Sequence, residues 1–222
     1  MKALMMTKYG DALSSLEVQE VPTPKVGDSQ ILIKVHSASF NPFDYKLLRG
    51  DFKAMGKIQF PEGIGKDVSG VVEKVGKKVK TFKAGDKVYS RIDESFAGTM
   101  AEYVISNASD SANIPSNLSH EESAGVPLAG LTAYQALTDV VKLSKGERIL
   151  IHAGSGGVGT FAIQFAKHLG AKVTTTTSTK NIELVKKLGA DKVIDYTKES
   201  YLDEENKFDV VFDTLGGNHT LD

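Results

Sequence analysis

Three glycines have the spacing of a turn that could hold a phosphate group. Gly154, Gly156 and Gly159 match the pattern G-x-G-x-x-G. An apolar segment over 149–153 precedes them, and apolar residues at helical spacing follow over 158–169. In a strand–turn–helix unit such glycines let backbone N–H groups approach a pyrophosphate, and the helix N-terminus adds partial positive charge. We therefore predict a dinucleotide site, against the alternative of a turn that is glycine-rich for packing alone.

The end of the next predicted strand indicates which dinucleotide would bind. An NAD site typically has Asp or Glu about 20 residues after the glycines. Here residues 174–181 read TTTTSTKN and contain no acid. Ser178 offers a hydroxyl group, Lys180 a positive charge, and Tyr196 a phenol at the end of the following strand. A 2′-phosphate is stabilised by such groups, so the pattern favours NADP(H). The alternative for Lys180 is a solvated surface lysine.

Composition excludes several other classes of function. The 222 residues carry a net charge of −1 and include no cysteine. The chain therefore has no disulfide, no thiolate nucleophile and no Cys-ligated metal, and its five histidines are not at ligand spacing, so we predict no metal site. Neutral charge argues against a nucleic-acid partner. No apolar run reaches the ~18 residues of a membrane span, and we predict no membrane association and a cytoplasmic location.

The order of predicted elements divides the chain into two domains. Residues 1–118 are predicted to form a β-barrel-like domain with one helix over 42–50 and short strands. Those strands are expected over 2–6, 16–21, 31–38, 68–75, 87–92 and 101–105. Residues 119–222 begin with a capping-box pattern, Ser119 and Glu122, and a helical segment that Pro127 breaks.

From residue 148 onward, predicted strands alternate with helices. Strands are expected over 148–153, 172–177, 192–196 and 208–213, and helices over 157–169 and 181–188. This alternation predicts a parallel sheet, so the fold class is α/β plus β. Dinucleotide domains usually have about six such strands. We therefore expect the sheet in this chain to be incomplete at its C-terminal end.

Several segments together resemble the medium-chain dehydrogenase/reductase superfamily, in its zinc-independent NADPH:quinone oxidoreductase-like branch. The matching segments are NPFDYKLLRG, GKDVSGVVEKVG, FKAGDKVY, GLTAYQAL, LSKGERILIHAGSGGVGTFAIQFAKHLGA, LVKKLGADKVIDY and FDVVFDTLGG. The resemblance implies a GroES-like β-barrel domain followed by a Rossmann domain, with the active site in the cleft between them. It also leaves a homodimer open as the assembly.

The resemblance assigns cofactor contacts to individual residues. It places Ser155, Gly157 and Val158 at the pyrophosphate, and Ser178 and Tyr196 at the 2′-phosphate. Thr132 matches a residue beside the nicotinamide.

The resemblance also bears on the catalytic residues and on zinc. Asn41 matches a polar residue of the substrate cleft, and Tyr45 lies one helical turn further on, with a packing aromatic as the alternative. Zinc-dependent relatives have Cys and Gly-His-Glu where this chain has Asn41 and Gly65-Lys66-Asp67. Protonated Lys66 is no substitute for a histidine ligand, so a zinc-free reaction is implied.

Without a Lewis acid, a substrate already activated by conjugation is expected. We predict hydride transfer from NADPH to a quinone or to the C=C bond of an α,β-unsaturated carbonyl, with Asn41 and Tyr45 donating hydrogen bonds to the substrate oxygen. Three alternatives stay open: an enoyl-thioester reductase, a non-catalytic NADPH-binding protein, and an inactive fragment.

Overall fold

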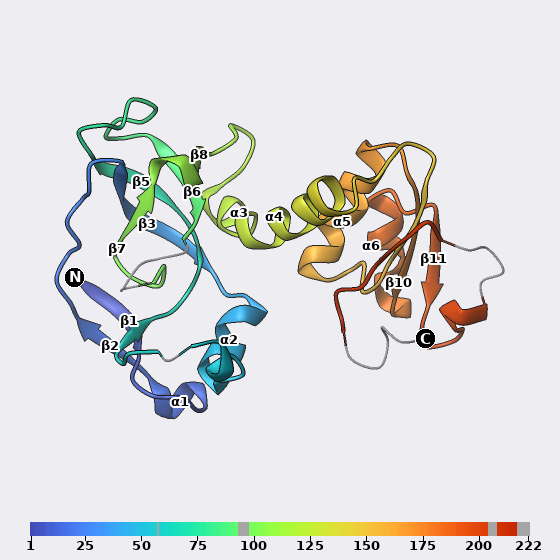
Figure 1. Cartoon of the computed structure of the whole chain (residues 1–222), viewed down its shortest axis with the longest axis horizontal. Helices are drawn as coiled ribbons and strands as arrows, with labels where there is room; N and C mark the ends of the chain where they lie inside the picture. The colour runs from blue at the N-terminus through green and yellow to red at the C-terminus, as the bar shows by residue number, and fades with distance from the viewer. Residues whose placement is uncertain (57, 93–97, 204–207, 217–222) are drawn as a thin grey trace. The chain divides into compact units, whose positions relative to one another are not determined.

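The computed structural model describes residues 1–56, 58–92, 98–203 and 208–216, and the chain forms two compact units, Met1–Leu128 and Ala129–Asp222 (Figure 1). The domain boundary that we predicted after residue 118 stays a prediction, while the first compact unit extends beyond it to Leu128. The reason is that helix α3 (His120–Ala124) packs against the barrel strands β3 and β5. Ser123 and Ala124 of this helix are buried.

The first unit is built of two antiparallel sheets. One has the strand order β2-β1-β4 and the other β7-β3-β5-β6-β8. The strands are β1 (Lys2–Met6), β2 (Leu16–Glu20), β3 (Gln30–Ser39), β4 (Glu62–Gly63), β5 (Asp67–Val75), β6 (Lys87–Arg91), β7 (Tyr103–Asn107) and β8 (Ser111–Asn113). The six predicted strands correspond to β1, β2, β3, β5, β6 and β7. The short strands β4 and β8 lack a pattern long enough to predict.

The core of the larger sheet follows from the alternation of side chains along a strand. Ile31 and Ile33 of β3 and Val68 and Val72 of β5 lie two or four residues apart, so they share one face and are buried together.

Two short helices complete the first part of this unit, α1 (Ala12–Ser15) and α2 (Pro42–Arg49). Helix α2 has Pro42 at its first position and ends at Gly50, which adopts the left-handed conformation (φ 85°). The predicted helix over 42–50 is therefore confirmed. Helix α1 is a single turn capped by Asp11, and we did not predict it.

The segment after the barrel is helical. The predicted capping box closes the start of α3, because Ser119 Oγ accepts from Glu122 N (3.1 Å) and Glu122 Oε2 accepts from Ser119 N (2.8 Å). Helix α3 ends at Ala124, and α4 (Pro127–Gln135) begins at Pro127, as predicted from the break at that proline. A π-helical turn, η3 (Ala136–Val140), follows directly.

The second unit has a parallel sheet of strand order β11-β10-β9-β12, which confirms the parallel sheet predicted from the alternation. The strands are β9 (Arg148–Ile151), β10 (Lys172–Thr177), β11 (Lys192–Asp195) and β12 (Val210–Phe212), with helices α5 (Gly157–His168) and α6 (Ile182–Lys187). Ile149, Ile151 and Val173 are fully buried in the core, with Ala162, Ile163 and Ala166 of α5. Strand β9 pairs with β10 on one side and β12 on the other, so the chain reverses direction across the sheet at β9. Such a switch point is where open α/β sheets bind ligands.

Candidate functional site

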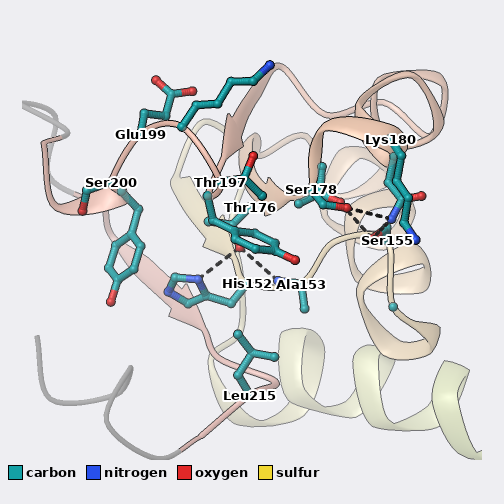
Figure 2. Close-up of a pocket in the computed structure, with 16 residues that line it drawn as sticks. His152, Ala153, Ser155, Thr176, Ser178, Lys180, Thr197, Glu199, Ser200 and Leu215 are labelled. Atoms are coloured by element: carbon teal, nitrogen blue, oxygen red, sulfur yellow. Dashed lines mark hydrogen bonds between the residues drawn. The ribbon is translucent and has the colours of Figure 1, made fainter.

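A cavity of about 940 Å³ lies in the second unit at the carboxyl ends of its parallel strands (Figure 2). Its walls come from four places: the turn after β9, the end of β10 with the turn after it, the loop after β11, and the segment after β12. The lining residues are His152, Ala153, Ser155, Gly156, Thr176, Thr177, Ser178, Lys180, Asn181, Tyr196, Thr197, Lys198, Glu199, Ser200, Tyr201 and Leu215. This volume is large enough for a substantial part of a dinucleotide.

Two glycines of the turn are required by close packing. A Cβ atom on Gly159 would lie 2.3 Å from Ala153 O, and one on Gly154 would lie 2.0 Å from Thr175 Oγ1. A side chain at Gly159 would therefore force the turn apart, and one at Gly154 would displace the buried side chain of Thr175. Ala153, directly before Gly154, has a positive φ of 52°, which is uncommon for a residue other than glycine.

A Cβ atom on Gly156 would lie 3.2 Å from Ala153 O, a tight contact with a backbone atom, whereas packing does not explain Gly157. Gly156 and Gly157 are exposed. A Cβ atom on Gly157 would have only Ala129 Cβ nearby, at 4.0 Å, which is ordinary contact. Gly156 caps α5 and has no side chain to satisfy the first N–H groups of the helix. Those N–H groups, with the partial positive charge of the helix end, are suited to an anion.

Hydroxyl and amide groups gather at one end of the cavity. Ser155 Oγ accepts from Thr177 Oγ1 (2.8 Å) and from Asn181 Nδ2 (3.0 Å). The Asn181 amide is also 3.4 Å from Ser178 Oγ. Ser155, Ser178 and Lys180 thus lie together in Figure 2, away from Ser200.

Five of the predicted cofactor residues line this cavity: Ser155, Gly156, Ser178, Lys180 and Tyr196. Val158 packs partly buried against the core of the unit, and the side chain of Thr132 on α4 is exposed. Gly154, Gly157, Gly159, Val158 and Thr132 are not among the lining residues. Their assignment as cofactor contacts stays a prediction.

Sequence reasoning missed several residues of the wall. His152 is buried, with its Nδ1 3.3 Å from Thr176 Oγ1 and its ring edge-on to Tyr201 at 4.6 Å between centroids. Lys198 is a second cation, 3.5 Å from Asp195 Oδ2. The position of His152 directly before the glycine turn was an available signal. The loop that carries Lys198 and Tyr201 has no motif, so its place in the wall depends on the fold.

In the first unit, Asn41 belongs to a buried hydrogen-bond network. Its amide Nδ2 donates to Asp67 Oδ2 (3.0 Å) and to Ser39 Oγ (3.3 Å). Asp67 Oδ1 accepts from Leu128 N (3.0 Å). Both amide hydrogens of Asn41 therefore point to protein groups. For Asn41 to donate to a substrate, as we predicted, one of these bonds would have to be exchanged.

Two carboxyl groups are buried around Asn41. Burial raises the pKa of Asp67 and the pKa of Asp44 above their ordinary value, although Asn41 opposes both shifts: its side chain donates to Asp67, and its backbone N donates to Asp44 Oδ2 (2.6 Å). The predicted residue Tyr45 lies on α2, half-buried, with the Arg49 guanidinium 4.9 Å from its ring centroid.

No group of three or more His, Cys, Asp or Glu side chains in the part of the chain that the structure describes could hold a metal ion. No helix there is long and apolar enough to cross a bilayer.

Comparison with known proteins gives the family. Residues 27–116 match the alcohol dehydrogenase GroES-like domain, and residues 157–222 match the model described as zinc-binding dehydrogenase. The quinone oxidoreductase from Coxiella burnetii superposes with a TM-score of 0.86 at 38% identity, over 98% of this chain and 69% of that one.

Two curated relatives are similar over nearly the whole chain. The 2-methylene-furan-3-one reductase of Solanum lycopersicum is 44% identical, and the chloroplastic NADPH-dependent alkenal/one oxidoreductase of Arabidopsis thaliana is 42% identical, each over 97% of this chain. The chain spans 57% and 58% of their lengths. Because the second relative is named as chloroplastic, a cytoplasmic location stays a prediction, as does a homodimer. The sheet topology, the glycine turn and these matches together show that the chain belongs to the medium-chain dehydrogenase/reductase superfamily, in its quinone oxidoreductase-like branch.

Proposed function

We propose that this protein transfers hydride from NADPH to a quinone or to the C=C bond of an α,β-unsaturated carbonyl, without zinc. The observation that carries the cofactor proposal is the exposed Gly157 at the start of α5. Packing does not require glycine there, because a Cβ atom would have ordinary contacts. A ligand that approaches the backbone closely would require it, as a pyrophosphate does.

The polar lining of the cavity supports NADPH over NADH. Lys180 and Lys198 bring two cations to the wall, and Ser178 brings a hydroxyl group. The carboxylate among the lining residues, Glu199, is exposed and lies within hydrogen-bond distance of Asp195 N (3.3 Å). No carboxylate stands at the end of β10, where an NAD site would bind the ribose hydroxyl.

The donor set around Asn41 supports a reaction without zinc. The chain has no cysteine, and the Asn41 amide faces Asp67 as a hydrogen-bond donor, so this pair does not present the thiolate and imidazole ligands of a catalytic zinc site. A conjugated substrate fits, since its acceptor carbon needs less activation than a simple carbonyl.

Each part of the chain would then have a defined task. NADPH, when bound, supplies the hydride. The glycine turn and the start of α5 would hold its pyrophosphate, and the Ser178–Lys180 turn would hold its 2′-phosphate. Asn41 and Tyr45 are the residues that we propose to hydrogen-bond the substrate oxygen as charge develops on it.

The test measures oxidation of NADPH and of NADH with a panel of quinones, enones and enoyl thioesters. The rate is read from the loss of the reduced-nicotinamide absorbance. One charge-assisted hydrogen bond to the 2′-phosphate is worth about 1.5–3 kcal/mol, which predicts a preference for NADPH of about 10–100-fold in kcat/KM. Treatment with a strong chelator should leave the rate unchanged. Turnover of enoyl thioesters alone would replace quinones and enones as the proposed substrate class. Nucleotide binding without any turnover would contradict the proposal that the protein is an enzyme.

A further inference from the structure

Asp195 is a buried carboxylate that does not line the cavity but hydrogen-bonds to two of the segments that form its walls. It is the last residue of β11, directly before Tyr196, and its side chain is 6% exposed. Its Oδ2 accepts from the Thr179 hydroxyl, and its Oδ1 accepts from Thr197 N (3.1 Å) and Thr197 Oγ1 (2.7 Å). Lys198 Nζ lies 3.5 Å from Oδ2.

These contacts join two segments that are far apart in the chain. Thr179 belongs to the turn η4 (Thr179–Asn181) after β10, which also carries Lys180. Thr197 and Lys198 belong to the loop after β11, which also carries Tyr196. One carboxylate therefore links the segments that present Lys180 and Tyr196, in addition to the pairing of β10 with β11.

We propose that Asp195 is a positioning residue for recognition of the 2′-phosphate. It holds the Ser178–Lys180 turn and the 196–198 loop at a fixed separation, so that groups from both reach the same phosphate. This inference rests on the proposed function, because it assumes that NADPH occupies the cavity. It adds a residue that touches neither the cofactor nor the substrate.

The charge of Asp195 has a second consequence. The Thr179 hydroxyl, and next the Thr197 hydroxyl, lower the pKa of Asp195 to about 2, so the group is ionised at neutral pH. A bare carboxylate beside a phosphate site would repel the phosphate. Here its oxygens are occupied by the donors named above and by Lys198, which it also partly neutralises. Loss of the contacts should therefore lower the affinity for the 2′-phosphate, whereas loss of the negative charge should raise it.

Two substitutions separate these effects. Asp195→Ala removes the links and should lower affinity for a 2′-phosphate. Asp195→Asn keeps an acceptor oxygen and the shape of the side chain while it removes the charge opposite Lys198. It should therefore increase the preference for a 2′-phosphate, whereas a merely structural role predicts an unchanged preference.

The experiment is calorimetric titration of the whole chain with adenosine 2′,5′-bisphosphate and with 5′-AMP. For Asp195→Ala we expect the affinity for the bisphosphate to fall by about 10-fold, as for loss of one or more hydrogen bonds, and that for 5′-AMP by less than about 3-fold. Thr179→Val removes only the hydroxyl that links the turn to Asp195, and should show part of the same selective loss. If Asp195→Ala does not fold, Thr179→Val alone tests the positioning role.

Asp191→Ala is the matched control. Asp191 directly precedes β11, at the opposite end of the strand, where it accepts from Lys167 Nζ (2.7 Å) and Val173 N (2.7 Å). Its removal should leave the ratio of the two affinities unchanged, whatever its effect on stability. Equal losses for both nucleotides in Asp195→Ala, or unchanged affinities in it and in Thr179→Val, would overturn the positioning role. Wild-type protein that binds the bisphosphate no more tightly than 5′-AMP would instead overturn the proposed cofactor.

Discussion

A methyl group at Gly159 should test whether the glycine turn is held by close packing. The Cβ atom of Gly159→Ala would lie 2.3 Å from Ala153 O and 2.7 Å from Gly154 Cα. Both are backbone atoms, which have no alternative rotamer to adopt. The turn and the first turn of α5 would have to separate by roughly 1 Å to restore ordinary contact in a close-packed interior.

The cost follows from two opposing contributions. Overpacking of this kind destabilises proteins by about 1–3 kcal/mol, and backbone contacts place Gly159→Ala at or above the upper end. Replacing glycine by alanine inside a helix stabilises the folded state by about 1 kcal/mol, because alanine has the higher helix propensity. We expect a net loss of about 2 kcal/mol, which corresponds to a fall in Tm of about 4–8 °C for a chain of this size.

Gly157→Ala is the control in the same helix. Its Cβ atom meets only Ala129 Cβ at 4.0 Å, so stability should be unchanged or slightly higher. Its methyl group nevertheless stands at the N-terminus of α5, where we propose that the pyrophosphate binds, so affinity for NADPH should fall.

Thermal unfolding and NADPH titration of both variants distinguish the two roles. An unchanged Tm in Gly159→Ala would refute the packing argument. Wild-type NADPH affinity in Gly157→Ala would refute the claim that a ligand, rather than packing, requires glycine at that position.

Three further perturbations test other parts of the molecule. Lys180→Glu should lower kcat/KM for NADPH by about 10–100-fold and for NADH much less, as measured by steady-state kinetics; equal losses would count against a 2′-phosphate contact. Ser119→Ala removes the hydroxyl that accepts from Glu122 N, and should lower the free energy of unfolding in urea by about 1 kcal/mol. An unchanged free energy of unfolding would show that solvent replaces the cap. Burial and the nearby His36 lower the pKa of His120, whose ring stacks on that of His36 at 4.3 Å, so the folded state resists protonation and stability is lost as pH falls below about 6.5. In melting curves from pH 7 to pH 5, His120→Gln should therefore lose less stability than the wild-type protein, and an equal loss would contradict this.

Elements with local signals could be predicted from the sequence. The range of β10 over 172–177 and the cap at Ser119 follow from side chains that are neighbours in the chain. The parallel sheet followed from alternation of strands and helices, because such connections have few possible topologies. The contact-defined division after Leu128 did not follow, since it depends on where α3 packs.

The candidate site likewise has parts that local sequence patterns predict and parts that depend on packing. The glycine turn lies within one strand–turn–helix unit, so the spacing of Gly154, Gly156 and Gly159 was enough to locate it. Sequence alone also placed Ser178 and Lys180 after β10, and both line the cavity. The assignment of these residues to a cofactor stays a prediction.

Only the tertiary structure decided what the side chains face. It directed the Asn41 amide to Asp67, 26 residues later, and placed Asp195 between Thr179 and Thr197. The sequence by itself determined the local turn and the order of the strands, because helix and strand periodicity and glycine spacing act over a few residues. Contacts between distant residues depend on how whole elements pack, and no short pattern records that packing.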